Sequence, residues 1–403
     1  MTAGQHNASA SAVGYLYQVN WALIELLESA PTKPDQAISL ETHDDVAWEA
    51  AGSPVELLQT KHHVGVSSTG LGDKDTDIWK TLLVWMNTAQ PTDPQGPALI
   101  LVTTSVAQPG TAAQALRKDV RDTAAAVLRL TEAARSSTAD NTKKARDRFL
   151  ALTEAERQIF IARVVVADGA PNADDLDEKL SRILWSALPD SHQDLFLSMV
   201  WRWWAAVALD MLRGHRARVS AGEAHAAISH VRDQFSEDHL PTTVELADVD
   251  ESSVVAAHGE KVFVHQMRWV AYNETNLRRA IVDYYRAVTQ ATRWLTDDLI
   301  GMHELERFED NLRDEWERIF ADMVEDLGID ADETAKIAAG KELLRRLRDS
   351  TAVNVRPLYN DPFFARGRRH VLADRGDIGW HPEFQSRLES LLSVAAPSAA
   401  PEG

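Results

Sequence analysis

Cysteine is absent from the 403-residue chain. Its absence excludes disulfides, thiolate metal ligands and thiol nucleophiles, and it fits a reducing compartment. Long apolar runs are missing too, because no stretch approaches the roughly 18 consecutive apolar residues of a membrane span. The first residues carry no basic region followed by an apolar run, so they do not resemble a secretory signal. We therefore expect a soluble, cytoplasmic protein without a membrane partner.

Two motifs of well-known chemistry are also missing, and positive charge is scarce. There is no GxxxxGK[ST] phosphate loop, so the chain is not expected to hydrolyse ATP itself, and no HExxH motif or dense histidine cluster indicates zinc. The formal net charge of −19 weighs against a DNA-binding surface spread over the whole protein. A local basic groove, a metal ion or a basic partner would still permit contact with DNA.

The first part of the chain has the pattern of an α/β domain. Hydrophobic residues make up 44% of the sequence, which is enough for packed cores, and the length predicts two or three domains. Apolar spacing and turn residues predict the following order. We expect a helix at 14–29, a strand or hairpin at 37–50, a strand at 55–63, a Gly/Ser-rich mobile loop at 64–75, a helix at 76–89 and a buried strand at 98–105.

From residue 111 onward the sequence is mostly helical. We expect one more strand within 160–169, a buried tryptophan-rich helix at 201–212, an acidic connector or short strand at 241–256, and helices at 274–298, 301–326 and 333–348. The expected organisation is an α/β domain at 1–135, a helical middle region at 142–240, a helical C-terminal interaction domain at 257–395 and a disordered tail at 396–403.

The residues that carry chemistry are Asp45, Gln59 and Lys61. Gln59 and Lys61 are two positions apart on one strand, so their side chains point to the same face. A turn at 52–54 separates them from Asp45, and a hairpin there would bring Asp45 beside Gln59. A carboxylate, an amide and an ammonium group would then share one face of the sheet.

This arrangement suits metal-dependent hydrolysis of a phosphodiester. The reaction needs a hard cation to generate hydroxide and to neutralise a phosphate oxygen, and Mg²⁺ or Mn²⁺ takes oxygen ligands. We expect the metal ligands to be the Asp45 carboxylate, the Gln59 amide oxygen and the Thr60 carbonyl. Lys61 would orient the attacking water or stabilise charge on phosphorus. The alternative is that Gln-x-Lys occurs by chance and that the two aspartates are turn formers or solvated charges.

Five blocks in order extend this pattern into a family resemblance. GYLYQ (14–18), LETHDDV (40–46), LLQTKHH (57–63), DIWKTLLVW (77–85) and LVTTS (101–105) together resemble the restriction-endonuclease-like, PD-(D/E)xK-type domain of the CD-NTase-associated double-strand DNA endonucleases. The resemblance implies that the catalytic residues are Asp45, Gln59 and Lys61, with accessory positions at Glu41, Asp44 and Gln18. The usual family motif has Asp or Glu where this chain has Gln59, and the Gln-x-Lys form is a variant found in the Mrr-like branch.

A second resemblance covers the C-terminal third. LRRAIVDYYRAVTQATRWLTDDLI (277–300) and RGRRHVLADRGDIGWHPEF (366–384) are similar to proteins of bacterial ABC-three-component conflict systems, of which Lamassu-type anti-phage defence is the best-known relative. The two resemblances imply a restriction-endonuclease-like α/β domain followed by a mainly α-helical region. They also imply a double-stranded DNA endonuclease effector that oligomerises and is controlled by an SMC-like ATPase and a small middle subunit.

Two other functions remain open from the sequence. The nuclease fold can persist as a non-catalytic scaffold within the same complex, which the acidic charge and Gln59 both permit. The same site can also act on RNA or on single strands. His62 and Lys80 are candidate DNA contacts, although for His62 we favour the interpretation of a polar residue at a strand end. We assign Trp79 and Trp85 to the core.

Aromatic and basic residues near the C-terminus each allow two interpretations. One stripe would stack on bases or, as we favour, pack between helices or subunits; it consists of Tyr284, Tyr285, Arg286 and Trp294. A dense basic patch would bind DNA or pair with the acidic segment 310–320; it consists of Arg366, Arg368, Arg369 and His370.

Overall fold

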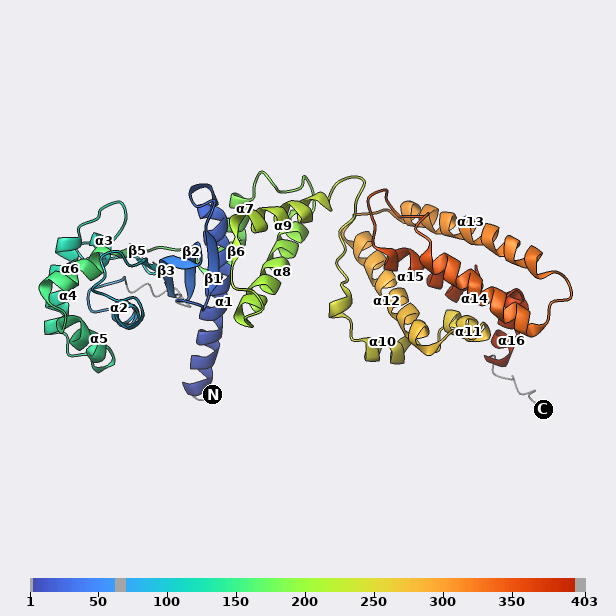
Figure 1. Ribbon diagram of the computed structural model, residues 1–403, viewed down its shortest axis with the longest axis horizontal. Helices are drawn as coiled ribbons and strands as arrows, with labels where there is room; N and C mark the ends of the chain where they lie inside the picture. The colour runs from blue at the N-terminus through green and yellow to red at the C-terminus, as the bar shows by residue number, and fades with distance from the viewer. Residues whose placement is uncertain (1–2, 62–69, 396–403) are drawn as a thin grey trace, which may run out of the picture. The chain divides into compact units, whose positions relative to one another are not determined.

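The computed structural model describes residues 3–61 and 70–395. The chain divides into two compact units, Met1–Arg232 and Asp233–Gly403 (Figure 1). The first unit contains a mixed α/β sheet and the second is helical, which confirms the predicted fold class of an α/β N-terminal part followed by a mainly helical C-terminal region.

The sheet of the first unit has six strands in the order β5-β4-β3-β2-β1-β6. Strands β1, β2 and β3 form an antiparallel meander, whereas β3, β4 and β5 run parallel to one another. Between β3 and β4 the chain passes through α2, the crossover helix that a parallel pair requires. The bounds are β1 (Ala37–Leu40), β2 (Val46–Ala50), β3 (Ser53–Lys61), α2 (Thr76–Thr88), β4 (Ala98–Thr103), β5 (Val164–Ala167) and β6 (Val219–Ser220).

A two-residue turn and a bulge together set the register of β2 against β3. Ala51 and Gly52 have φ angles of 51° and 83°, which is the positive-φ pair of a type I′ hairpin turn. Glycine adopts this conformation without strain. Beyond the turn, a register shift that follows Trp48 aligns Val46 with Leu58. The register places the residue before β2 opposite the residue after Leu58, which decides the geometry of the candidate site.

Helices cover both faces of this sheet. On one face α2 packs its tryptophans into a core with Leu57 and Leu99, joined by side chains of α4, α5 and α6. On the other face Trp48 donates its indole N–H to Glu25 of α1 at 3.0 Å. The helices of this unit are α1 (Ala3–Ser29), α3 (Ala112–Ala115), α4 (Thr123–Ser136), α5 (Asp140–Leu150), α6 (Glu154–Ala162), α7 (Leu176–Ile183), α8 (Gln193–Leu212) and α9 (Ala221–Asp233).

The sheet takes strands from the range predicted to be a helical middle region. Strand β5 occupies only the second half of the predicted strand at 160–169, because residues through Ala162 continue helix α6. Strand β6 pairs with β1 through Val219 and Ile38. The unit therefore extends past residue 135 to Arg232, since removing β5 and β6 would expose both edges of the sheet.

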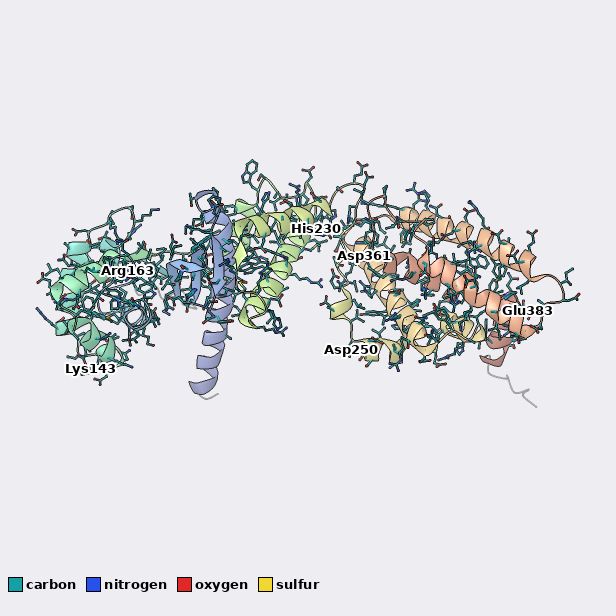
Figure 2. The ribbon with its side chains drawn as sticks, in the orientation of Figure 1. Lys143, Arg163, His230, Asp250, Asp361 and Glu383 are labelled. Atoms are coloured by element: carbon teal, nitrogen blue, oxygen red, sulfur yellow. The ribbon has the colours of Figure 1, made fainter. Side chains whose placement is uncertain are left out.

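Arg163 holds the edge of the sheet to the connection that follows α2. Its guanidinium donates to the carbonyls of Ala89, Gln90, Asp93 and Pro97, each at 3.0 Å. The side chain is buried and lies directly before β5, where Figure 2 labels it. These bonds satisfy carbonyls of the connection that follows α2.

Helix α8 is the tryptophan-rich segment expected at 201–212. Within the described residues it is the one helix long and apolar enough to cross a membrane, with a third of its apolar window buried. Trp204 donates its indole N–H to the carbonyl of Val19 in α1 at 2.7 Å, and α8 also contacts α1 and β1. These contacts pack α8 against α1 and β1 within the first unit.

The second unit is a helical bundle built around α12 and α15. Gly367 of α15 lies so close to α12 that an added Cβ would be 2.1 Å from the Asp283 carbonyl. The helices are α10 (Glu251–His258), α11 (Val262–Trp269), α12 (Glu274–Thr296), α13 (Met302–Leu327), α14 (Glu333–Asp349), α15 (Pro362–Arg375) and α16 (Phe384–Ala395). The segment 241–256 is a connector with a short 3₁₀ turn that leads into α10, and the structure shows no strand there.

The C-terminal aromatic and basic residues are mostly inside this unit. Tyr284, Arg286 and Trp294 are buried by helix packing. Arg368 and Arg369 pair with Glu309 and Glu315 of α13, and both guanidiniums are buried. The structure thus favours helix packing for the stripe and pairing with the acidic helix for the patch.

Candidate active site

The candidate site lies where β2 begins and β3 ends. Asp45 immediately precedes β2, and the hairpin register puts it opposite Gln59 of β3. The Gln59 amide nitrogen Nε2 donates to Asp45 Oδ1 at 2.8 Å, and the Lys61 ammonium lies 3.4 Å from Gln59 Oε1. The structure therefore brings together the three side chains that the sequence pattern singles out.

The backbone of Thr60 completes the contacts of Asp45. Its N–H donates to Asp45 Oδ2 at 3.0 Å, so each carboxylate oxygen of Asp45 accepts a hydrogen bond from β3. Gln59 and Thr60 are buried, whereas Asp45 and Lys61 are half-buried. The site is thus held by buried strand backbone but keeps its charged groups within reach of solvent.

Asp44 is fixed by a tryptophan that sequence reasoning assigned only to the core. The Trp85 indole Nε1 of α2 donates to Asp44 Oδ2 at 2.7 Å. Asp44 Oδ1 accepts from the Gln59 amide and, at 3.0 Å, from the Asp45 backbone N–H. Helix α2 thereby fixes the position of the carboxylate next to Asp45, a role that no spacing rule reveals.

The other accessory residues connect α1 to the same site. Gln18 Nε2 donates to Glu41 Oε1 at 2.9 Å and to the Asp45 carbonyl at 3.0 Å. Glu41 has a φ angle of 53°, and its N–H donates to that same carbonyl at 3.2 Å. Its side chain is exposed, so it adds negative charge at the rim of the site.

Of the two candidate DNA contacts, the structure describes only Lys80. Lys80 is exposed on α2 and, at about 100° per residue, lies roughly 140° around the helix from Trp85. His62 lies outside the described residues, and so does the rest of the segment 62–69. Both remain predictions of the sequence pattern.

Burial makes the negative charge of this site costly. Burial raises the pKa of the Asp45 carboxyl to about 6. The Thr60 N–H and the Lys61 ammonium oppose this shift, whereas the negative charges of Asp44 and Glu41 act in the same direction as burial. Burial also raises the pKa of Asp44, although the hydrogen bonds from Trp85 and Gln59 lower it. A cation placed at Asp45 would relieve this excess of negative charge.

The donor set fits a hard divalent cation with one adjustment. Carboxylate, amide and backbone carbonyl oxygens are the ligands that Mg²⁺ accepts. The amide nitrogen of Gln59 faces Asp45 and its amide oxygen faces Lys61. To become a metal ligand beside Asp45, the amide must rotate so that the oxygen takes the place of the nitrogen. Among the described residues there is no group of three or more His, Cys, Asp and Glu side chains arranged to hold a metal, so the amide and a backbone carbonyl would have to contribute.

Comparison with known proteins gives one match. Residues 263–388 match the family model described as C-terminal domain 7 of the ABC-three component (ABC-3C) systems. The match places the protein with these multi-component systems and covers α12 to α15 of the helical unit. The curated proteins and the solved structures that were searched give no match.

Proposed function

We propose that this chain, as a protein of the ABC-three-component systems, is a metal-dependent double-stranded DNA endonuclease and the effector of an anti-phage defence complex of the Lamassu type. The observation that carries the proposal is the convergence of Asp45, Gln59 and Lys61 at the adjoining ends of β2 and β3. The element order supports it as well, because a helix, three antiparallel strands, a crossover helix and a parallel strand build the sheet around these residues.

The residues of the chain would divide the work of phosphodiester hydrolysis. Mg²⁺ or Mn²⁺, when bound, supplies the positive charge that activates water and neutralises a phosphate oxygen. Asp45, Gln59 and the Thr60 carbonyl would hold the ion. Lys61 would orient the water or stabilise charge on phosphorus, and the Trp85–Asp44 bond would keep the Gln59 amide in place.

Control by partner subunits completes the proposal. The Glu41 carboxylate is exposed at the rim of the site, and the chain carries a net charge of −19, so the site offers little attraction for free DNA. We propose that an SMC-like ATPase and a small middle subunit deliver DNA to the site and that assembly pairs two sites across the two strands. Such control would keep a toxic activity silent in the isolated chain.

Plasmid cleavage tests the enzymatic proposal. The purified chain, alone and with the products of its neighbouring genes, is incubated with supercoiled plasmid and Mg²⁺, Mn²⁺ or EDTA. We expect cleavage that EDTA and Lys61→Ala both abolish. Lys143→Ala is the matched control, because this lysine is exposed on α5 and pairs only with Asp147 (Figure 2).

One observation favours a second candidate, a non-catalytic scaffold. The Gln59 amide already satisfies Asp44 and Asp45 by hydrogen bonding, which is a stable arrangement without a metal. Absence of cleavage under every condition, with partner binding retained, would favour this scaffold over the enzyme. Cleavage of RNA or single strands in place of duplex DNA would support the same catalytic residues with a different substrate.

A further inference from the structure

The helical unit contains a cavity that the proposed nuclease activity does not use. It has a volume of about 750 Å³ and is lined mainly by residues of α12, α14 and α15, together with Trp380. That size is within the range of sites for small molecules. Most of its lining residues fall within the stretch that matches the ABC-three-component domain.

The cavity is lined with positive charge in a strongly acidic chain. Five arginines face it, against the two carboxylates of Glu251 and Asp283; the arginines are Arg279, Arg286, Arg348, Arg366 and Arg369. Guanidinium groups recognise phosphate and carboxylate oxygens through paired donors. A cluster of this kind, in a chain with a net charge of −19, indicates an anionic occupant.

Two buried side chains at the cavity carry donor atoms that have no acceptor among the described residues. Arg369 is 2% exposed and pairs with Glu315 through Nη2, but its Nε and Nη1 have no hydrogen-bond partner. Trp380 is 1% exposed, and its indole Nε1 also lacks a partner. Buried donors are nearly always satisfied in proteins, so an acceptor from outside the chain is the simplest occupant of this space.

Three of the other four arginines are held in place, each from a different helix. Arg366 of α15 uses its Nε on Asp283 at 2.8 Å, and Arg348 of α14 is bound by Asp349 at 2.8 Å. Arg286 of α12 donates to the Val244 carbonyl at 3.0 Å, with its guanidinium 3.7 Å from the ring centre of Phe363. Cations fixed in this way lose little freedom when an anion binds.

Apart from Asn276 and His370, the rest of the wall is apolar or aromatic. Met267, Ala280, Leu344, Leu347 and Tyr272 line the cavity together with the Trp380 ring. A bare phosphate ion would leave this surface uncovered, whereas a phosphate that carries a flat organic group would cover it. We infer that the cavity binds an organic phosphate of the nucleotide class, with its phosphate on the arginines and its base against the apolar wall.

Binding to the full-length chain tests this inference. Isothermal titration is performed with AMP, GMP and ATP, with adenosine as the ligand that lacks phosphate and with inorganic pyrophosphate as the ligand that lacks a base. We expect at least one nucleotide to bind more tightly than adenosine and pyrophosphate. The same nucleotide should also raise the unfolding temperature of the protein, because it binds only the folded unit.

Matched variants locate the site. Arg279 is exposed at the cavity and has no ion pair or hydrogen bond to the described residues, so Arg279→Ala should leave the fold intact and weaken binding about tenfold. Arg278→Ala is the control, because Arg278 is the adjacent arginine on α12 but pairs with Glu274 and does not line the cavity. Trp380→Phe removes the unpartnered N–H, keeps most of the ring and should also weaken binding.

Two outcomes would overturn the inference. One is the absence of binding by any of the nucleotides at millimolar concentration. The other is binding that Arg279→Ala and Trp380→Phe leave unchanged, which would place it elsewhere on the chain. Lys61→Ala should bind nucleotide as the wild type does, so failure of the proposed nuclease activity would be seen separately.

Discussion

At the scale of single residues, the candidate site is a network in which one amide and one indole position two carboxylates. Gln59 donates to both Asp44 and Asp45, and Trp85 donates to Asp44. Each charged group therefore depends on a neutral donor that comes from another element. Changing a neutral donor should disturb the site without changing its charge.

Trp85→Phe tests the positioning role of the indole. The ring stays in the core, but Asp44 loses a 2.7 Å hydrogen bond, which should cost about 1–3 kcal/mol of stability. We expect DNA cleavage to fall about tenfold, since a misplaced Asp44 frees the Gln59 amide. The cleavage rate is measured at several Mg²⁺ concentrations. If Trp85 positions the site, the rate of the variant stays low even when Mg²⁺ is saturating.

Trp79→Phe provides the control for Trp85. Its indole also lies on α2 and donates at 2.9 Å, but to the Asp73 carbonyl and not to a residue of the site. It should lower stability with little effect on the cleavage rate. Equal loss of cleavage in both variants would mean that Trp85 acts only through the fold.

The raised pKa of Asp45 predicts how stability depends on pH. Because the folded pKa is about 6 and the ordinary value is 3.8, the folded state binds this proton more tightly than the unfolded state. Asp45 therefore stabilises the folded state relative to the unfolded state below pH 4, and this stabilisation is lost as the pH rises through 6. Relative to the wild type, Asp45→Asn should gain about 1–3 kcal/mol at pH 7.

Calorimetric unfolding between pH 4 and 8 measures this effect. The difference between wild type and Asp45→Asn should grow from pH 4 to 6 and then stay constant. Millimolar Mg²⁺ should remove much of the difference at pH 7, because the ion stabilises only the ionised carboxylate. A difference that does not vary with pH would contradict the assigned cost of burying this charge.

At the scale of elements, the sequence predicts the site better than it predicts the edges of the sheet. Strand periodicity and a turn predict a hairpin that brings Asp45 near Gln59, but the register that sets the two opposite each other also depends on a bulge after Trp48, which the sequence does not show. Strand β6 was missed since it has only two residues, and its pairing with β1 is a tertiary contact. The roles of Trp85 and Arg369 were missed because the sequence does not show which buried donors have a partner.

Close packing of α12 against α15 gives a prediction for the helical unit. Gly367→Ala would place a Cβ 2.1 Å from the Asp283 carbonyl and 2.4 Å from the Ala287 side chain. We expect this substitution to lower the stability of the unit by about 1–3 kcal/mol or more. Gly301→Ala is the control, because nothing lies within 4 Å of its added Cβ, and it should change stability far less.

At the scale of the whole molecule, the two compact units predict separate folding. The division between Arg232 and Asp233 leaves all six strands in the first unit and α10 to α16 in the second. Each unit buries its own core, so fragments 1–232 and 233–403 should each unfold cooperatively. Circular dichroism during thermal unfolding checks this, and a fragment without a cooperative transition would contradict the division.

The same division fits an effector joined to an interaction region. The first unit contains the candidate nuclease site, and the second contains the ABC-three-component match and the arginine-lined cavity. The proposed defence function therefore depends on chemistry at Asp45, Gln59 and Lys61.

Binding of Mn²⁺ at that site is the most direct test. Electron paramagnetic resonance of Mn²⁺ is recorded with the Lys61→Ala chain, its partner subunits and a short DNA duplex, which this assembly should bind without cutting. We predict one tightly bound Mn²⁺ ion per chain, and we predict that a second substitution, Asp45→Ala, abolishes its binding. Identical Mn²⁺ binding with and without the Asp45 carboxylate would contradict the proposed metal centre.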